Sequence, residues 1–172
     1  MTIRRVVGVA CALAALLVAP TTASVPDGKP RVKRLTLFTD RSETENGGVD
    51  LGPAGLSKGD VYVQANPVRN KDGKVVGTYD LSCTTIDEDN GAGQVRQLCD
   101  TATSLRRRGQ IVTTGIVLAV PHPSATRFPG LLPVRRFTMP IVGGTGKFRG
   151  ARGVLQRTFG DPRTTLRFRY RR

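Results

Sequence analysis

Histidine and tryptophan are the scarcest side chains of this sequence. His122, in "PHPS", is the only histidine, tryptophan is absent, and aromatic residues make up 5% of the chain. Zinc sites need several Cys, His or carboxylate ligands, and a Ser-His-Asp hydrolase needs a histidine base beside a nucleophile elbow, for which no motif exists. We therefore expect no metal site and no hydrolase of this kind.

Long apolar runs are confined to the N-terminus. A basic start, "MTIRR", precedes the run "VVGVACALAALLVAP" and the small residues "TTAS". This is the layout of a secretory signal peptide, and the run is too short for a comfortable membrane span. We predict a signal peptide at 1–24, a single mature domain at 25–172 and a secreted protein. Arg4-Arg5 allows a twin-arginine leader, but its neighbours favour general secretion.

Acidic residues are few: 27 Lys and Arg stand against 13 Asp and Glu, a net charge of +14. Removing the leader with Arg4 and Arg5 leaves +12. Such a charge favours anionic partners, namely nucleic acid, an anionic surface polymer or lipid headgroups. The alternative is a general arginine richness of exported proteins from high-GC organisms.

The C-terminal stretch "RFRYRR" alternates aromatic residues with arginines. Phe168 and Tyr170 share one strand face, and the arginines lie on the other. This predicts a strand with a basic face and no specific nucleic-acid site.

Only Cys83 and Cys99 remain after the leader. Between them lies "TTIDEDNGAGQVRQL", whose centre is a turn signal, and Gly91 is the midpoint. A hairpin folded about Gly91 would place the two cysteines opposite each other on adjacent strands. Because an even cysteine count in an exported chain indicates a disulfide, we predict a Cys83–Cys99 bond.

The mature chain is rich in β-forming residues and has no extended helical periodicity. Eight segments separated by turn clusters are predicted strands: 34–40, 60–68, 74–86, 94–105, 110–120, 135–142, 151–159 and 163–172. Eight short strands favour a sandwich or a closed barrel, and a barrel leaves no exposed edge. "ETENGGVD", residues 43–50, lacks the ligand pattern of a calcium loop and is expected to be a flexible charged loop.

"IVGGTGKFRGARG", residues 141–153, has the density of glycine that phosphate-binding loops use. The P-loop pattern fails because Phe148 follows Gly146-Lys147, and the dinucleotide pattern ends on Arg149. The residues after it alternate like a strand, whereas both motifs need a helix there. We therefore predict that Gly143, Gly144, Thr145 and Gly146 form a tight strand-to-strand turn.

This stretch also carries a family resemblance. "GGTGKFRGARG" resembles the GGTG-x-F/Y-x-x-A-R-G signature of dirigent proteins and their relatives in the allene oxide cyclase barrel superfamily. "GDVYVQANPVRNKDGKVVGTYDLSC", "RRRGQIVTTG" and "LTLFTDRSE" resemble three further family segments in family order, so the resemblance covers roughly 34–170. It implies an all-β fold, a closed eight-stranded antiparallel barrel.

The resemblance also implies a class of function. Members bind small hydrophobic or phenolic molecules inside the barrel; some cyclise them, others direct phenoxy-radical coupling, and none needs a metal or organic cofactor. Confinement of the reacting atoms carries this chemistry. Whether this chain catalyses a cyclase- or isomerase-like reaction is open, and the alternative is a non-catalytic barrel that binds a ligand, a partner protein or an anionic polymer through its basic surface.

Residue by residue, the resemblance maps a pocket. Asn66 matches a pocket asparagine of the cyclases, and Asp40 matches the aspartate of the dirigent His-Asp pair, with Thr39 in place of the histidine. Leu35 and Leu37 replace the cyclases' glutamate and asparagine, and the dirigent pocket arginine has no counterpart. Candidate catalytic residues are thus Asp40, as a base near the mouth, and Asn66, as a polarising group. The expected ligand-binding residues are Tyr62, Gln64, Asn66, Tyr79, Leu81 and Thr103.

Alternatives to these roles are structural: Asp40 caps a turn with Arg41 and Ser42, and Asn66 holds the bend before Pro67. The resemblance also places Val61, Val63 and Ala65 on the outer face, and by the same assignment Phe137, Met139 and Ile141. Apolar outer faces need a cover. We therefore expect a homo-oligomer, a dimer or trimer as in the family, unless the assignment of inner and outer faces is exchanged.

Overall fold

The computed structural model describes residues 31–89, 91–121 and 131–172, so the predicted leader at 1–24 lies outside the described residues. Its strands are β1 (Lys33–Asp40), β2 (Glu45–Val49), β3 (Val61–Arg69), β4 (Val75–Asp87), β5 (Val95–Leu105), β6 (Gly109–Pro121), β7 (Leu131–Pro133), β8 (Arg136–Gly144), β9 (Arg152–Thr158) and β10 (Arg163–Arg171). Two short 3-10 turns, η1 (Arg41–Glu43) and η2 (Gly146–Phe148), interrupt them. Within the described ranges, no helix is long and apolar enough to cross a membrane.

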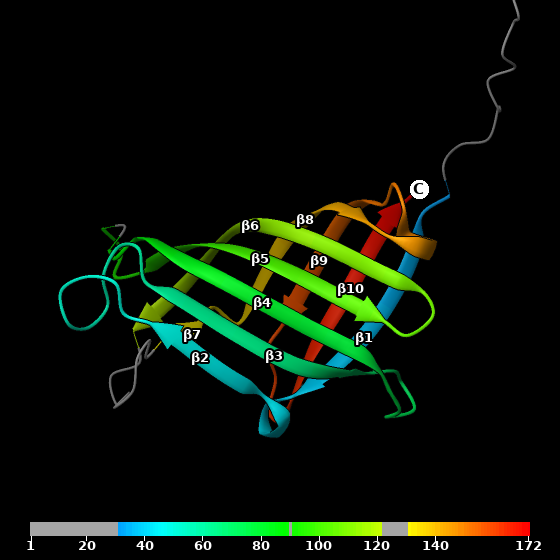
Figure 1. Ribbon diagram of the computed structural model, residues 1–172, viewed down its shortest axis with the longest axis horizontal. Helices are drawn as coiled ribbons and strands as arrows, with labels where there is room; N and C mark the ends of the chain where they lie inside the picture. Colours follow the sequence, from blue (N-terminus) through cyan, green and yellow to red (C-terminus); the bar gives the residue numbers. More distant parts are fainter. Residues whose placement is uncertain (1–30, 90, 122–130) are drawn as a thin grey trace, which may run out of the picture.

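Eight of these strands form a closed antiparallel ring in the order β1-β10-β9-β8-β6-β5-β4-β3, and β1 pairs back to β3. Figure 1 shows the ring as two walls whose strands cross, with β3 to β6 on one side and β8 to β10 and β1 on the other. The eight ring strands are the eight predicted from the sequence. The predicted closed eight-stranded β-barrel is therefore confirmed.

The prediction of a flexible loop at 43–50 is wrong. Residues 45–49 form β2, which pairs with β3 from Glu45↔Ala65 to Val49↔Val61. β1 leaves β3 after a single pair, Phe38↔Arg69, so β2 takes over the hydrogen-bonding edge of β3 that β1 leaves uncovered. All five β2 residues, two of them glycines, are exposed, and so the strand needs no apolar alternation that the sequence could have displayed.

Alternation along the ring strands places the core inside the barrel. The largest fully buried side chains include Tyr79, Phe148, Phe168, Leu37 and Met139. Val61, Val63 and Ala65 face outward as expected. The outward assignment of Phe137, Met139 and Ile141 is wrong, because Met139 and Ile141 are buried and Phe137 packs against the core. Thr138 and Pro140 take the outward positions of β8, so the apolar set of that strand is core.

The glycine-rich stretch is the tight turn that the sequence predicts. Thr145 N donates to Gln110 O, and Lys147 N donates to Arg108 O, which fixes η2 against the β5–β6 hairpin. A Cβ on Gly144 would lie 2.5 Å from Gln110 O. Glycine is required here by close backbone approach, and the turn seats the buried Phe148 at this end of the barrel.

Cys83 and Cys99 form the predicted disulfide. The two residues are direct register partners on β4 and β5, with Cα atoms 4.0 Å apart. Both side chains are buried on the inner face of the barrel wall. Cys83 is therefore part of a structural cross-link, not a free thiol in the interior.

Candidate functional site

A buried arginine stands inside the barrel. β9 alternates so that Leu155 and Arg157 point inward, and only 3% of Arg157 is exposed. β9 and β4 are four places apart in either direction around the ring, so they lie on opposite walls. The Arg157 side chain crosses between these walls. It donates to Tyr79 Oη at 3.3 Å and to Gln64 Oε1 at 3.1 Å.

Aromatic rings surround the guanidinium of Arg157. Its central carbon lies 4.5 Å from the ring centre of Phe159, 4.9 Å from that of Tyr79 and 5.9 Å from that of Phe137. Cation–π attraction offsets part of the cost of removing the charge from water. No carboxylate neutralises the charge of Arg157, since this residue forms no ion pair within the described part of the chain.

Several buried polar atoms beside Arg157 have no hydrogen-bond partner in the described protein. They are Arg157 Nε, Asn66 Nδ2 and Thr103 Oγ1 on inward positions, together with Thr158 Oγ1 of the next residue on β9. Asn66 and Thr103 are the two register partners of Tyr79, which itself contacts Arg157. Arg157 Nε, Asn66 Nδ2 and Thr103 Oγ1 therefore offer two N–H donors and a hydroxyl around the ring of Tyr79. Buried donors of this kind are unusual and call for an acceptor.

The six predicted ligand-binding residues all lie on inward positions of three adjacent strands. β3 contributes Tyr62, Gln64 and Asn66, β4 contributes Tyr79 and Leu81, and β5 contributes Thr103. Tyr62 lies at the β2 end of this group of side chains, because its Oη donates to Asn46 Oδ1 of β2 at 2.7 Å. The structure thus brings these side chains together on one wall, facing Arg157.

Burial changes the acidity of two of these residues. Removal from water raises the pKa of Tyr79 above its ordinary value, although Arg157 opposes the shift. Burial raises the pKa of Tyr62 in the same way, and Arg157 again opposes it. Both phenols are neutral at physiological pH and act as hydrogen-bonding groups.

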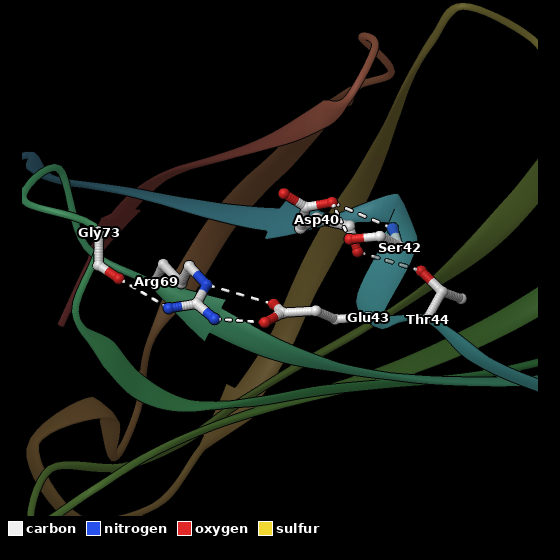
Figure 2. A network of polar contacts seen from close by, with 6 residues as sticks. All are labelled: Asp40, Ser42, Glu43, Thr44, Arg69 and Gly73. Atoms are coloured by element: carbon white, nitrogen blue, oxygen red, sulfur yellow. Dashed lines mark hydrogen bonds and ion pairs between the residues drawn. The ribbon is translucent and has the colours of Figure 1, made fainter.

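Asp40 lies apart from this cluster. It ends β1 on an outward position, while the neighbouring Thr39 is the buried, inward residue. Its carboxylate accepts hydrogen bonds from Ser42 N at 3.0 Å and Ser42 Oγ at 2.8 Å, as Figure 2 shows. The side-chain hydrogen bond from Ser42 is the main cause that lowers the pKa of Asp40. The base role stays a prediction, and this geometry favours the capping role instead.

The seam between β1 and β3 positions Asn66. Side chains reinforce its single ladder pair: Arg69 forms an ion pair with Glu43 and donates to Gly73 O at 2.8 Å (Figure 2). Thr44, next to Glu43, donates from Oγ1 to Asn66 Oδ1 at 2.5 Å. This bond uses one acceptor position of the Asn66 amide oxygen, whereas Nδ2 has no partner in the described protein and is the group available to a ligand.

Arg157 is the site residue that the sequence analysis missed. Alignment to the dirigent pattern found no pocket arginine. The signal lay in the strand "GVLQRTF" itself, where Arg157 falls in the inward register between Leu155 and Phe159. An arginine in the apolar half of an alternating strand is the pattern that identifies it.

Comparison with known proteins gives a family and several similar folds. Residues 40–169 match the family model of the allene oxide cyclase barrel like domain. No curated protein matches the sequence. A pyocyanin demethylase structure is 22% identical with a TM-score of 0.57, covering 78% of this chain and 98% of its own. The exo-specific intermolecular Diels-Alderase AbnU is 14% identical with a TM-score of 0.55, covering 81% and 98%. A pterocarpan synthase dirigent protein is 19% identical with a TM-score of 0.54, covering 83% and 91%.

Proposed function

The chain belongs to the allene oxide cyclase barrel like domain family, and from this premise we propose that its barrel binds a small hydrophobic or phenolic molecule and directs its cyclisation or coupling. The ligand carries an acidic or strongly polarised oxygen that meets Arg157. Similar folds whose names describe a Diels-Alderase and a dirigent protein support a role of this type. Their identity is too low to transfer a substrate.

The main observation behind this proposal is that Arg157 is buried without an acidic partner in the described protein. Placing a cation in a protein interior is costly unless an opposite charge or a full set of acceptors receives it. Here the described residues provide two neutral oxygens and three rings, and Nε has no partner. A ligand carboxylate supplies two oxygens that this guanidinium can hold in bidentate fashion, and a phenolate or enolate supplies one charged acceptor.

The neighbouring side chains define what happens to a bound molecule. Arg157 and Asn66 Nδ2 stabilise negative charge that develops on a carbonyl oxygen as a ring closes or a radical couples. Tyr79, Phe137 and Phe159 hold the unsaturated or aromatic part in one orientation. Fixing both ends of a flexible substrate removes unproductive conformers, which is the main source of acceleration in such reactions.

Ligand binding without chemistry is the second candidate. The outward position of Asp40 and its lowered pKa favour it, because they leave the interior cluster without the predicted carboxylate base. Product analysis separates the two: a transformed ligand supports the first candidate, and recovery of the unchanged ligand supports the second.

We also infer export and self-association. The predicted leader supports export, and N-terminal sequencing of secreted material should begin at Ser24 or Val25. On the outer face, Leu98 and Ile116 are direct cross-strand partners, both exposed, and Val63 on β3 is exposed as well. This supports a homo-oligomer, and light scattering at micromolar concentration should give a mass above that of a monomer.

Paired ligands test the proposed function. We expect an aromatic or polyene carboxylic acid to bind at least about tenfold more tightly than its methyl ester, because only the acid pairs with Arg157. Arg157→Gln should abolish this preference, measured by calorimetry. Arg152→Gln, an exposed change on the same strand, is the matched control and should keep it. An ester that binds as well as the acid to the unaltered protein would refute the role of Arg157.

A further inference from the structure

The outer surface of β1, β10 and β9 carries arginines that the proposed function does not use. Along β10, exposed arginines alternate with the buried Leu166, Phe168 and Tyr170. These three strands are neighbours in the ring and lie side by side in Figure 1. We define the basic face by its exposed outward arginines: Arg34 of β1, Arg167, Arg169 and Arg171 of β10, and Arg152 of β9.

Like charges oppose each other directly on this face. Arg34 is the register partner of Arg169, and Arg171 is the register partner of Arg152. Directly opposed like charges destabilise a sheet. Within the described residues, none of the five arginines takes part in an ion pair.

The charge is segregated around the barrel, which a general arginine richness does not explain. Asp161 is the only acidic residue after Asp100 in the sequence. The exposed Asp80 and Asp100 lie on the outer face of β4 and β5, in the other wall of the ring. An anionic partner is therefore attracted more strongly to the wall of β1, β10 and β9 than to the wall that carries Asp80 and Asp100.

A groove of about 320 Å³ crosses the basic face. One row of register partners along it is Thr36↔Arg167↔Gln156↔Thr138, and Arg34 and Arg169 stand beside this row. Hydroxyl and amide groups of Thr36, Gln156 and Thr138 thus stand next to the guanidinium groups of Arg34, Arg167 and Arg169. Phe168 forms part of the lining but is buried, so the wall of the barrel separates the groove from the interior cluster.

We propose that this groove binds an acidic polysaccharide chain. Guanidinium groups pair with carboxylates in bidentate fashion, and Thr36, Thr138 and Gln156 can hydrogen-bond sugar hydroxyls. No exposed aromatic side chain lines the groove, which disfavours nucleobase stacking. Val154 is its only exposed large apolar side chain, which is too little to enter a lipid layer.

Retention on immobilised polygalacturonate tests the proposal, with the full mature chain and a sodium chloride gradient. We expect Arg34→Gln combined with Arg167→Gln and Arg169→Gln to weaken binding at least about tenfold and to reduce the log–log salt slope by roughly three. The control removes the same charge elsewhere, through Arg106→Gln, Arg107→Gln and Arg135→Gln, and should change affinity less than about threefold.

Folding is monitored in the same variants. Because Arg34→Gln and Arg169→Gln remove an opposed like-charge pair, the melting temperature of the groove variant should be equal or higher at low salt. Equal losses in the groove and control variants would overturn the proposal in favour of diffuse attraction. Equal or tighter binding to single-stranded DNA of matched charge, or to neutral dextran, would also overturn it.

Discussion

The guanidinium of Arg157 lies 4.9 Å from the ring centre of Tyr79, although the two residues belong to opposite walls of the barrel. Their contact crosses the interior and joins β9 to the β3–β4 wall, where Asn66 and Gln64 flank it. A cation in this position organises the polar side chains around it. The proposed function rests on this relationship.

The alkaline titration of Tyr79 should report on this contact. Its raised pKa means that the folded state holds the proton more firmly than the unfolded state, whose phenol titrates near 10.0. Stability is therefore fully present below pH 10 and is lost as the pH rises towards the folded pKa. Denaturant unfolding between pH 9 and 11 should show this loss, and Tyr79→Phe should reduce it. A pH-independent free energy of unfolding would contradict the burial of Tyr79.

Arg157→Met should separate stability from binding. Replacing an uncompensated buried charge by an apolar side chain is expected to leave the free energy of unfolding unchanged or to raise it by up to about 2 kcal/mol. Leu155→Ala, on the same inner row, is the control and should lose about 2–5 kcal/mol. If Arg157→Met instead loses more than about 3 kcal/mol, the residue serves the fold and not a ligand.

Asn66 and Asp40 should behave differently when substituted. Asn66→Ala removes a buried donor and should weaken ligand binding roughly tenfold, consistent with one hydrogen bond to a charged group. Asp40→Asn should leave binding within about twofold, because asparagine also caps a turn. Calorimetry gives the affinities and chromatography the products. Loss of product with unchanged binding in Asp40→Asn would restore Asp40 as the catalytic base.

Gly153 should tolerate no side chain. Its φ is +154°, and a Cβ would lie 2.0 Å from Arg169 O of the neighbouring strand. Gly153→Ala should therefore cost more than about 3 kcal/mol. Gly150 also has positive φ, +73°, but has no atom within 4 Å of a Cβ, and Gly150→Ala should cost about 1 kcal/mol. Thermal unfolding of both variants measures the difference, and equal losses would count against the close approach.

The disulfide should contribute through the unfolded state. Cys83 and Cys99 close a loop with a sequence separation of 16, for which the chain-entropy model gives about 3 kcal/mol. Replacing both cysteines by alanine should lower the free energy of unfolding by about that amount. Peptide mapping without reductant should show one linked pair, and two alkylatable thiols in the native protein would disprove the bond.

The fold was predictable because local signals agreed. Strand alternation, turn clusters and the cysteine spacing around Gly91 each describe one hairpin or one strand, and together they give the eight ring strands. β2 was not predicted, because an exposed strand that only hydrogen-bonds to the edge of β3 shows no alternation of apolar and polar side chains. The predicted facing of β8 was wrong because it was carried over from β3, with which β8 does not pair, whereas pairing with β9 holds Met139 and Ile141 inward.

The candidate site was predictable only on one wall. The family resemblance predicted Asn66, Tyr79 and Thr103 as pocket residues, and the structure places all three on inward positions of β3, β4 and β5. Arg157 reaches them from the opposite wall, and only closure of the barrel brings β9 across from β4. Asp40 illustrates the converse case: it matches a family position in sequence, yet its side chain bonds to Ser42 and stays outside the cluster.

Recovery of the bound molecule decides whether Arg157 holds a ligand inside the barrel. The protein is incubated with an extract of its producing organism, washed and examined by native mass spectrometry, beside Arg157→Gln and the control Arg152→Gln. We expect that an acidic or phenolic small molecule stays with the unaltered protein and with Arg152→Gln, and is lost from Arg157→Gln. A neutral ligand without an acidic or polarised oxygen, or equal retention by all three proteins, would contradict it.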